Sequence, residues 1–438
     1  MTRRQRNREI EAEIIDLSHD GRGVAKLDGK TVFISGALTG ERVRARIHIS
    51  KKHFDEGHVL EVLDASPLRV EPPCPHFEIC GGCSLQHLKA EAQIEAKQHI
   101  LLENFERIGH VRPQTVLPPL TDQPWGYRRK ARLGVKWVAA KERAIVGFRE
   151  ALKPMYVADI HSCRVLVPQV GERIHELSAL VSSMDARERI PQIEVAAGDD
   201  ATALVFRHLD PLSTADTQRL IDFGQRTGLM IYLQPGGNDS VHALWPTDAA
   251  LSFRIPAADV ELAFRPLDFV QVNAGMNQRM IARTLELLDP QPGERVLDLF
   301  CGLGNFTLPI ARRAAQVVGV EGEAGLVARA RDNARANAVT NAEFFAADLS
   351  QDLRGEAWVK QGFDKLLLDP PRTGADACIP QLPLDGVRRI VYVSCHPGSL
   401  ARDAGILVRE HGYRLVSAGV MDMFPHTAHV ESIALFER

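Results

Sequence analysis

Hydrophobic and polar residues alternate in short runs at the beginning of the chain, up to about residue 68. Turn residues such as Asp28-Gly29 and Thr39-Gly40 separate these runs. Alternation with a period of two is typical of half-buried strands, and several short strands at close spacing indicate a small closed sheet. Residues 1–68 are therefore predicted to form an OB-like β-barrel. The expected strands are Ile10–Leu17, Val24–Leu27, Thr31–Ile34, Arg42–Ile49 and His58–Leu63.

The pattern is different from about residue 266 to the C-terminus, where apolar strand runs alternate with helical segments. Strands and helices that alternate in this way form a parallel sheet with helices on both faces. A Rossmann-like domain is therefore predicted over residues 266–438. Its expected strands are Arg295–Phe300, Val317–Val320, Ala342–Ala347, Lys365–Leu368 and Arg389–Ser394.

The middle of the chain gives weaker signals. Glu71-Pro72-Pro73 marks a boundary, and the apolar positions between Ala90 and Ile108 roughly follow a helical period. From about residue 115 to 265, short strand-like runs mix with loops, and their order in a sheet is not predicted. We expect a central α+β domain over residues 69–265.

Composition limits the location and the partners. The chain has 438 residues, 45% hydrophobic and 25% charged, so two or three globular domains are expected. No apolar stretch is long enough for a membrane span, and no apolar segment follows the basic N-terminus as in a secretory signal. We therefore expect a cytoplasmic protein without a membrane partner. The net charge of -3 gives no overall attraction for nucleic acid, so any RNA site must be local.

Two segments gather basic residues locally. The first lies on the expected barrel and includes Arg42, Arg44, Arg46, Lys51 and Lys52. The second, Trp125–Arg149, has eight Lys or Arg residues and one acid, interleaved with Trp125, Tyr127, Trp137 and Phe148. Cations bind phosphates while aromatic faces stack on unpaired bases, so both segments are candidate RNA contacts. The alternatives are a solvated strand face and basic strands packed on a core.

A glycine-rich turn follows the first strand of the Rossmann-like region. Residues 298–306 read DLFCGLGNF, and the glycines let the backbone turn tightly and approach a ligand. Glu321 ends the next strand, where it can accept hydrogen bonds from ribose hydroxyls, and Asp348 follows the third, where it can accept from an adenine amino group. Thr307 replaces the third glycine of NAD-type sites. The pattern favours S-adenosylmethionine; a helix N-cap is the alternative role of Asp348.

Two further motifs follow later strands. Asp369-Pro370-Pro371-Arg372 carries an arginine where amino-methyltransferases have an aromatic residue, which weakens that interpretation. Cys395 ends the fifth strand and could add to C6 of a uracil, after which C5 attacks a sulfonium methyl and a base removes the C5 proton. We expect nearby basic groups to favour ionisation of Cys395. Glu431 is the candidate base; a structural cysteine and a surface carboxylate are the alternatives.

These motifs together resemble the RNA uracil-C5 methyltransferase family. The similar segments are FVQVN at 269–273, DLFCGLGNF, LLLDPPR at 366–372, VSCHP at 393–397 and HVES at 429–432. The resemblance implies a class I methyltransferase fold, with Cys395 as nucleophile and Glu431 as base. It also implies that Phe269 stacks on RNA bases. The residues implied to line the S-adenosylmethionine site are Gln271, Phe300, Asn305, Glu321, Asp348 and Asp369.

Seven cysteines in a chain without a secretory signal do not indicate a disulfide framework. Four of them could hold zinc or a [4Fe-4S] cluster, and spacing alone slightly favours zinc. These are Cys74, Cys80, Cys83 and Cys163. Residues 74–88, CPHFEICGGCSLQHL, resemble the iron–sulfur segment of one branch of the same family. That resemblance implies a [4Fe-4S] cluster on these four cysteines.

The expected fold class is multidomain α/β: a Rossmann-like class I methyltransferase domain preceded by a barrel that resembles a TRAM domain and an iron–sulfur-containing α+β central domain. This domain content resembles the branch that modifies 23S ribosomal RNA, with uridine 1939 as the implied target. 23S ribosomal RNA is thus the expected partner of a monomer that does not act on DNA. The alternatives are another 23S uridine or tRNA as substrate, a cytosine-C5 methyltransferase, and a non-catalytic RNA-binding assembly factor.

Overall fold

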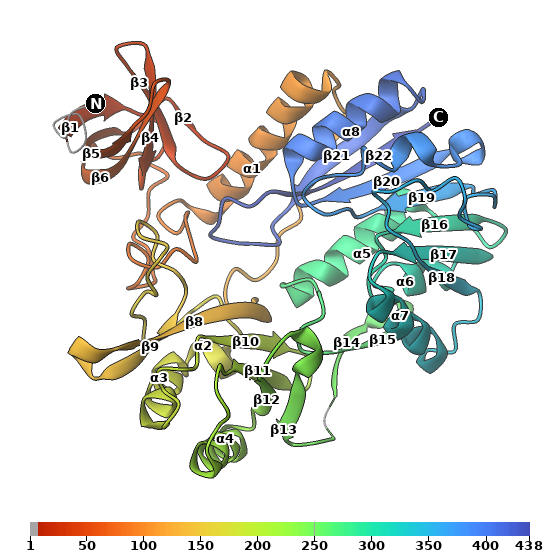
Figure 1. The fold of residues 1–438 in the computed structure, drawn as a ribbon. Helices are drawn as coiled ribbons and strands as arrows, with labels where there is room; N and C mark the ends of the chain where they lie inside the picture. The colour runs from red at the N-terminus through yellow and green to blue at the C-terminus, as the bar shows by residue number, and fades with distance from the viewer. Residues whose placement is uncertain (1–7, 249) are drawn as a thin grey trace.

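Three sheet-based units make up the molecule, and Figure 1 shows them in three separate regions. The computed structural model describes residues 8–248 and 250–438. The start of the expected barrel region, residues 1–7, lies outside the described residues. Within the described ranges, no helix is both long enough and apolar enough to cross a membrane.

The N-terminal unit is a six-stranded sheet with the order β1-β5-β6-β4-β3-β2. Its strands are β1 (Arg8–Glu13), β2 (Asp16–Leu17), β3 (Gly23–Leu27), β4 (Lys30–Ser35), β5 (Arg42–Ser50) and β6 (Phe54–Asp64). Because β1 and β2 are consecutive in the chain but lie at opposite ends of this order, the sheet curls around a core that includes Val32, Ile34 and Val43. The predicted barrel is confirmed, with the run Ile10–Leu17 divided between two strands.

The arginines on the outer face of β5 are each paired with a carboxylate from a neighbouring strand or its end. The pairs are Arg42–Asp64 at 2.8 Å, Arg44–Glu61 at 3.0 Å and Arg46–Glu9 at 2.8 Å. Lys51 and Lys52, in contrast, are exposed and have no ion pair among the described residues. Of the five basic barrel residues singled out in the sequence, the two without an ion pair among the described residues therefore lie at the β5–β6 turn rather than along β5.

The central unit is a six-stranded sheet whose order, β13-β12-β11-β10-β8-β9, the sequence did not predict. Its strands are β8 (Lys130–Val138), β9 (Arg143–Gly147), β10 (Gln192–Ala197), β11 (Thr202–Arg207), β12 (Met230–Gln234) and β13 (His242–Trp245). The helices α3 (Ile174–Ser183) and α4 (Thr214–Thr227) pack on the sheet, and the short α2 (Pro168–Gly171) precedes them. This arrangement is α+β, as expected.

The C-terminal unit is an eight-stranded sheet with the order β18-β17-β16-β19-β20-β22-β21-β7. Five parallel strands agree closely with the predicted ones: β16 (Arg295–Leu299), β17 (Gln316–Glu321), β18 (Ala342–Ala346), β19 (Lys365–Leu368) and β20 (Arg389–Ser394). The antiparallel β21 (Arg414–Met421) and β22 (Glu431–Glu437) were not predicted. Its helices are α5 (Ala274–Leu288), α6 (Thr307–Ala311), α7 (Ala324–Ala336) and α8 (Pro397–Arg409).

Alternate residues of each parallel strand enter two different cores, one on each face of this sheet. Val296 and Val317 pack with α5, whereas Leu297 and Val318 share a core with α1 (Ala90–Asn104) and α8. Figure 1 shows α1 beside α8. The predicted sheet with helices on both faces is confirmed.

Residues that the sequence grouped in one central domain divide between two sheets. α1 and the π-helical turn Phe105–Gly109 pack against α8, and β7 (Thr115–Val116) is the edge strand beside β21. The hairpin β14 (Leu251–Ile255) and β15 (Val260–Phe264) packs in the core that contains α5. The chain therefore enters the C-terminal unit before it builds the central sheet, which single-sequence periodicity could not reveal.

A buried carboxylate joins the barrel to the linker that follows it. Glu41 is 0% exposed and accepts hydrogen bonds from the Leu38 and Ser66 amides and from Arg69. Burial acts to raise the pKa of Glu41, but the Arg69 and Leu38 hydrogen bonds outweigh it and hold the pKa below its ordinary value. Glu41 thus stabilises the fold in its ionised form.

We predict that Glu41→Ala lowers the free energy of unfolding of the barrel by about 2–3 kcal/mol, because Arg69 and two amides lose a charged acceptor. The depressed pKa means that this contribution is present above the ordinary glutamate pKa and is lost as pH falls through the folded-state pKa. Denaturant unfolding at neutral and acid pH measures both effects. The exposed Glu61→Ala is the control, with a loss below about 1 kcal/mol; equal losses for the two variants would contradict the prediction.

Candidate active site

The predicted site residues gather at one edge of the C-terminal sheet. Phe300 follows β16, Glu321 ends β17, Asp369 follows β19 and Cys395 follows β20. The carboxyl ends of parallel strands meet at the same edge, which is where ligands bind in open α/β sheets. The structure therefore brings together residues that are up to 95 positions apart in the chain.

The glycine-rich turn has the backbone conformation that its glycines allow. Gly302 and Gly304 have φ values of +55° and +91°, and Phe300 adopts +65°. The Gly302 N–H donates to Glu321 Oε2 at 3.1 Å, and the Glu323 N–H donates to Oε1 at 3.1 Å. Two backbone amides thus fix the Glu321 carboxylate beside the turn.

A buried carboxylate beneath the turn has an unused acceptor. Asp298 is 0% exposed; its Oδ2 accepts from the Thr307 hydroxyl at 2.5 Å, whereas Oδ1 has no hydrogen-bond partner among the described residues. Burial raises the pKa of Asp298 to about 7, against the lowering effect of Thr307. A buried acceptor without a partner is costly, so this position favours a ligand that donates hydrogen bonds or carries positive charge.

Asn305 and Gln271 each connect the ligand-binding edge to a neighbouring part of the structure. The side-chain amides of Asn305 and Asn277 of α5 donate to each other's oxygens at 2.9 and 3.0 Å. The backbone carbonyl of Gln271 accepts from Arg129 Nε at 2.8 Å. The first contact fixes the turn on α5, and the second attaches the segment before α5 to the central sheet.

The two aspartates of the site have opposite environments. Asp348 is exposed and its Oδ1 accepts from the Ser350 amide at 3.0 Å and hydroxyl at 2.7 Å, which holds its pKa below the ordinary value. Burial instead raises the pKa of Asp369 to about 7. Asp348 therefore caps a turn after β18 at the ligand-binding edge. No helix begins at this position in the described part of the chain, so the alternative role as a helix N-cap does not apply.

Cys395 and Glu431 are neighbours across an antiparallel ladder. β20 pairs with β22 so that Ser394 lies opposite Ser432. Cys395 directly follows β20, and Glu431 is the first residue of β22, so extending this register by one position sets them opposite each other. The Glu431 charge also acts on Cys395. Opposed residues of a ladder project from the same face of the sheet. Two residues separated by 36 positions in the sequence thus share one site.

The charges around this pair oppose ionisation. Burial, and then the neighbouring Glu431 and Asp369 charges, raise the pKa of Cys395 to about 11, although Arg372 lowers it. Burial and Asp369 raise the pKa of Glu431 to about 8, with Arg372 and Lys97 acting in the opposite direction. The expectation that nearby basic groups favour the Cys395 thiolate is therefore wrong for the ligand-free protein. A cationic ligand at this edge would lower the pKa of each group.

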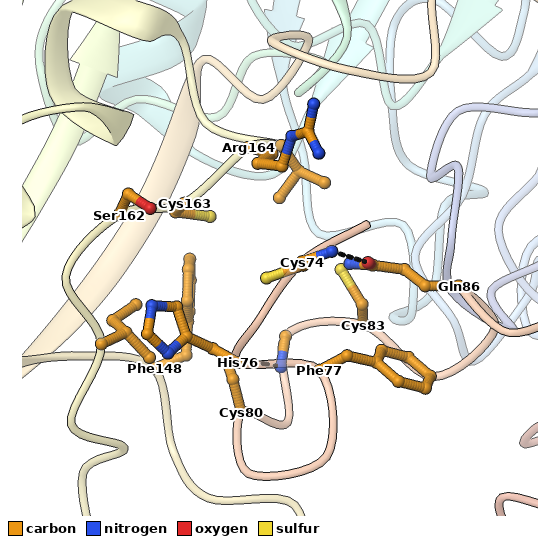
Figure 2. A pocket seen from close by; sticks show the side chains of 13 residues that line it. Cys74, His76, Phe77, Cys80, Cys83, Gln86, Phe148, Ser162, Cys163 and Arg164 are labelled. Atoms are coloured by element: carbon orange, nitrogen blue, oxygen red, sulfur yellow. Dashed lines mark hydrogen bonds between the residues drawn. The ribbon is translucent and has the colours of Figure 1, made fainter. Parts of the chain in front are cut away.

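The four predicted cysteine ligands line a single pocket, shown in Figure 2. Cys74, Cys80 and Cys83 lie on the loop before α1, and Cys163 comes from the segment before α2. The Cys74 amide donates to Gln86 Oε1 at 3.3 Å. Phe77, Phe148 and Ile160 supply apolar walls. The fold therefore brings Cys163 to a cysteine loop that is 80 residues away in the chain.

The thiols of this pocket need a positive charge in order to ionise. Burial, reinforced by the charges of the neighbouring cysteines, raises the pKa of Cys80 to about 11 and of Cys83 to about 12, and burial also raises that of Cys163. In the described part of the chain, no group of three or more His, Cys, Asp or Glu residues is arranged to hold a metal ion. As a donor set, four half-buried thiols in a largely apolar pocket suit a metal centre that binds thiolates.

Most side chains of Trp125–Arg149 are used inside the protein. Arg129 is 3% exposed, the Tyr127 hydroxyl donates to Pro425 O at 3.0 Å, and Trp125 stacks on His426 at 3.9 Å between ring centroids. Arg132 pairs with Glu194, and Lys141 and Arg143 pair with Asp159. Of the eight basic side chains, Arg129 alone is buried, and among the described residues four form no ion pair with a carboxylate: Arg128, Lys130, Lys136 and Arg149. The segment is therefore packed on the core in part, and RNA contact by its exposed cations stays a prediction.

Two residues around the site stand out in the structure more than in the sequence. Phe269, just before Gln271, is 69% exposed although it is a large aromatic residue. Lys97 of α1 is 1% exposed and acts electrostatically on Glu431. The sequence signalled Phe269 only through resemblance, and it did not distinguish Lys97 from an ordinary lysine on a helix.

Comparison with known proteins agrees with this geometry. Residues 247–438 match the family tRNA (Uracil-5-)-methyltransferase, and residues 3–60 match the TRAM domain. The chain is 62% identical over 442 residues to the 23S rRNA (uracil(1939)-C(5))-methyltransferase RlmD of Xanthomonas campestris pv. campestris (strain 8004), covering 99% of both chains. It is 63% identical to that of Xanthomonas oryzae pv. oryzae (strain MAFF 311018), covering 98% of this chain and 97% of the relative.

A solved structure has the same overall fold. Pyrococcus abyssi tRNA (uracil-54, C5)-methyltransferase in complex with S-adenosyl-L-homocysteine aligns with a TM-score of 0.74 and 25% identity. The alignment covers 98% of this chain and 100% of that one. Together with the identity to the Xanthomonas proteins over nearly the whole length, this establishes that the chain belongs to the RNA uracil-C5 methyltransferase family, in the branch of the RlmD proteins.

Proposed function

We propose that the protein transfers a methyl group from S-adenosylmethionine to C5 of uridine 1939 in 23S ribosomal RNA. The observation that carries this proposal is the Cys395–Glu431 pair beside the glycine-rich turn, in a chain 62% identical to proteins named for that reaction. A Pyrococcus relative is named for uridine 54 of tRNA, but its identity to this chain is only 25%. The ribosomal substrate is therefore favoured over tRNA.

The cationic sulfonium cofactor suits the acidic edge of the sheet. Glu321, fixed by two amides, would accept from the ribose hydroxyls, and Asp348 from the adenine amino group. The free Oδ1 of Asp298 would accept from the ammonium group. Phe300, Asn305, Gln271 and Asp369 would complete the walls. The positive charge of the bound cofactor would lower the raised pKa values of Cys395 and Glu431. Cofactor binding would therefore favour the Cys395 thiolate and the Glu431 carboxylate.

The cross-strand pair divides the chemistry between its two residues. The Cys395 thiolate would add to C6 of the uracil, which makes C5 nucleophilic. C5 would then bond to the methyl carbon of the sulfonium as the S–CH3 bond breaks and S-adenosylhomocysteine leaves. Glu431 then removes the proton from C5, the C5=C6 double bond re-forms, and the C6–S bond breaks to release the Cys395 thiolate. The target uridine must leave its stack to reach the pair, at a cost of a few kcal/mol.

RNA binding is assigned to exposed, unpaired groups. Phe269 lies two residues before Gln271 and offers a free aromatic face on which an unstacked base could bind. On the barrel, Lys51 and Lys52 offer free cations for phosphates, whereas the β5 arginines are already paired. We assign residues 1–68 to RNA binding, 69–265 to the cysteine centre and further RNA contacts, and 266–438 to methyl transfer.

We further propose that Cys74, Cys80, Cys83 and Cys163 hold a [4Fe-4S] cluster. The support is the single pocket that the four thiols line and the resemblance of residues 74–88 to an iron–sulfur segment. A bound cluster would supply positive charge to the thiols and four bonds that link the loop before α1 to the segment before α2. Its role is therefore assigned to structure and positioning.

The reaction assignment is tested with two variants and labelled cofactor. Cys395→Ala should abolish methylation and form no covalent complex. Glu431→Gln keeps the shape but cannot accept the proton, so it should transfer the methyl group and then stall as a denaturant-stable protein–RNA adduct. A denaturing gel with labelled methyl groups separates these cases. Glu437→Gln, at the opposite end of β22, is the control and should turn over; turnover of Glu431→Gln at the wild-type rate would show that Glu431 is not the base.

The metal assignment is tested by purification without oxygen. The protein should be brown and contain about four irons per chain. Cys163→Ala should lose the iron and destabilise the central sheet, whereas Cys378→Ala, a buried cysteine outside the pocket, should keep it. Metal analysis that finds stoichiometric zinc and no iron would contradict the assignment.

The barrel assignment is tested by the salt dependence of RNA binding. Lys51→Ala/Lys52→Ala should reduce the slope of log affinity against log salt by about 1–2, because each lost phosphate contact removes roughly one released ion. Arg44→Ala, whose guanidinium is already paired with Glu61, should change the slope less. A filter-binding or fluorescence titration measures both slopes, and an unchanged slope in the double variant would rule out phosphate contacts at this turn.

A further inference from the structure

A fully buried lysine lies outside the residues that the chemistry above uses. Lys97 is on α1 and is 1% exposed. Its Nζ donates to Asp422 Oδ1 at 2.6 Å and to the Phe424 carbonyl at 3.0 Å. Burying an ammonium group is costly, so such a residue persists in a fold only where partners compensate it.

Both partners of Lys97 belong to the loop that leads to Glu431. This loop, residues 422–430, connects β21 to β22, and Glu431 is the first residue of β22. Lys97 therefore attaches α1, which begins seven residues after Cys83, to the segment that carries the proposed base. The separation of 325 positions between Lys97 and Asp422 shows why no local sequence pattern reveals this contact.

The same loop is held at several other points. The Ser84 and Leu85 amides both donate to the His426 carbonyl at 2.9 Å, and Gln93 Oε1 accepts from the His426 amide at 2.9 Å. The Tyr127 hydroxyl donates to the Pro425 carbonyl. These anchors hold Pro425 and His426, whereas Lys97 holds Asp422 and Phe424. Removal of Lys97 should therefore free only the start of the loop and remove the positive charge beside it.

The charged groups that act on Glu431 come from several packed elements. Asp369, after β19, disfavours its carboxylate, while Arg372 of the same loop and Lys97 of α1 favour it. The Glu431 charge in turn raises the pKa of Cys395, which follows β20. Asp422 neutralises part of the Lys97 charge, and the nearby His426 and His429 have lowered pKa values because they are buried. Lys97 is thus the buried cation among these groups.

We propose that Lys97 is a positioning residue for proton removal: it holds the start of the loop before Glu431 and places there a buried positive charge that favours the carboxylate form of Glu431. This inference rests on the proposed role of Glu431 as the base. The step concerned begins with the methylated adduct, in which Cys395 is bonded to C6. The C5 proton passes to Glu431, the C5=C6 bond re-forms and the C6–S bond breaks.

The decay of the methylated adduct isolates this step from thiol ionisation. Once the adduct has formed, Cys395 is consumed, so the pH dependence of adduct decay reports the base alone. A base acts as its carboxylate, so decay accelerates as pH rises through the pKa of Glu431. Loss of the Lys97 charge raises that pKa, and the profile should therefore move to higher pH.

The experiment compares Lys97→Met and Lys97→Arg in single turnovers with labelled cofactor and 23S ribosomal RNA fragment. Lys97→Met should shift the pH midpoint of adduct decay upward by about 1 unit, which slows decay below the midpoint by about tenfold. Lys97→Arg, which keeps the charge, should retain the wild-type midpoint. The double variant Lys97→Met/Asp422→Asn removes both charges and leaves no unpaired buried charge. It should therefore be the more stable of the two variants, and it should shift the midpoint in the same direction as Lys97→Met.

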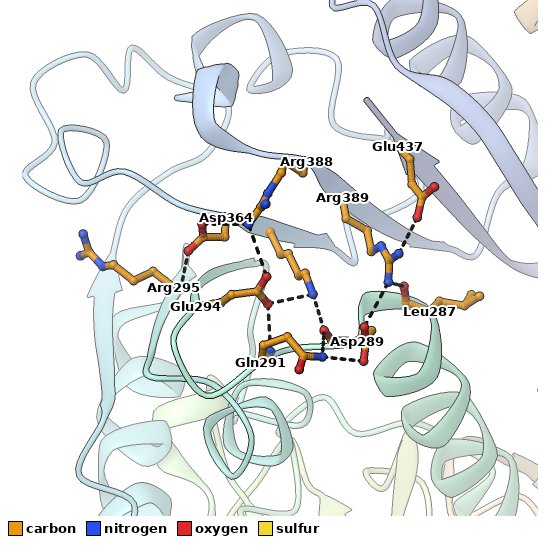
Figure 3. A network of polar contacts seen from close by, with 10 residues as sticks. Leu287, Asp289, Gln291, Glu294, Arg295, Asp364, Arg388, Arg389 and Glu437 are labelled. Atoms are coloured by element: carbon orange, nitrogen blue, oxygen red, sulfur yellow. Dashed lines mark hydrogen bonds and ion pairs between the residues drawn. The ribbon is translucent and has the colours of Figure 1, made fainter.

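A matched control lies at the opposite edge of the same sheet. Lys365 begins β19, is 6% exposed and pairs with Glu294 at 2.8 Å. It belongs to the polar network around Asp289, Glu294 and Arg388 shown in Figure 3. Lys365→Met also breaks a buried lysine ion pair, so it should lower stability without moving the midpoint of adduct decay.

The outcomes distinguish a failure of the base assignment for Glu431 from a failure of the role proposed for Lys97. If Glu431→Gln resolves its adduct at the wild-type rate, the base assignment fails whatever Lys97 does. If Glu431→Gln stalls but the Lys97→Met and double variants keep the wild-type midpoint, Glu431 remains the base and the role of Lys97 is overturned. An upward shift in these variants, absent from Lys97→Arg and Lys365→Met, supports the proposal.

Discussion

The antiparallel pairing of β22 with β20 is the contact on which the active site depends. Parallel strands all present their carboxyl ends at one edge, so Cys395 after β20 reaches the same edge as the glycine-rich turn after β16. An antiparallel neighbour instead brings its amino end to that edge. β22 begins there with Glu431, one position beyond the Ser394–Ser432 pair, and Cys395 follows Ser394. Strand direction therefore places the proposed nucleophile and the proposed proton acceptor at the same edge.

This placement has an electrostatic consequence. Asp298, Asp369 and Glu431 are buried carboxylates with pKa values raised to about 7, 7 and 8, and Cys395 is raised to about 11. With these raised pKa values, the carboxyl and thiol groups at the edge favour their protonated forms. A bound sulfonium cation would favour their ionisation, so cofactor binding and activation of the proposed nucleophile would be coupled through charge. Such coupling would limit the reactivity of the thiol when no methyl donor is present.

The second organising feature is the way that distant segments meet behind the site. The loop that carries Glu431 contacts Ser84 and Leu85, the two residues after Cys83, and Tyr127 of the segment before β8. The cysteine pocket and the catalytic edge therefore share one rigid connection. A change in the pocket that moves the residues after Cys83 has a direct path to the base.

The sequence predicted the parts with strong local signals. Uninterrupted apolar runs such as Lys365–Leu368 and Arg389–Ser394 gave strands with the correct ends, because buried parallel strands are apolar on both faces. Cys395 and Glu431 were found through chemistry and family resemblance, but their apposition depends on a β20–β22 register that no single segment encodes. The order of the central sheet was missed for the same reason. For the basic segment Trp125–Arg149, composition could not distinguish the buried Arg129 and Tyr127 from the exposed cations that remain candidate RNA contacts.

The most direct test of the account is to map the methyl group that the protein adds. Purified protein, S-adenosylmethionine and unmodified 23S ribosomal RNA are incubated, and the modified nucleotide is identified by nuclease digestion and mass spectrometry. The account predicts one 5-methyluridine, at position 1939, with one S-adenosylhomocysteine formed per methyl group. A methyl group on nitrogen or on cytosine, or no transfer from a protein that binds both substrates, would contradict it.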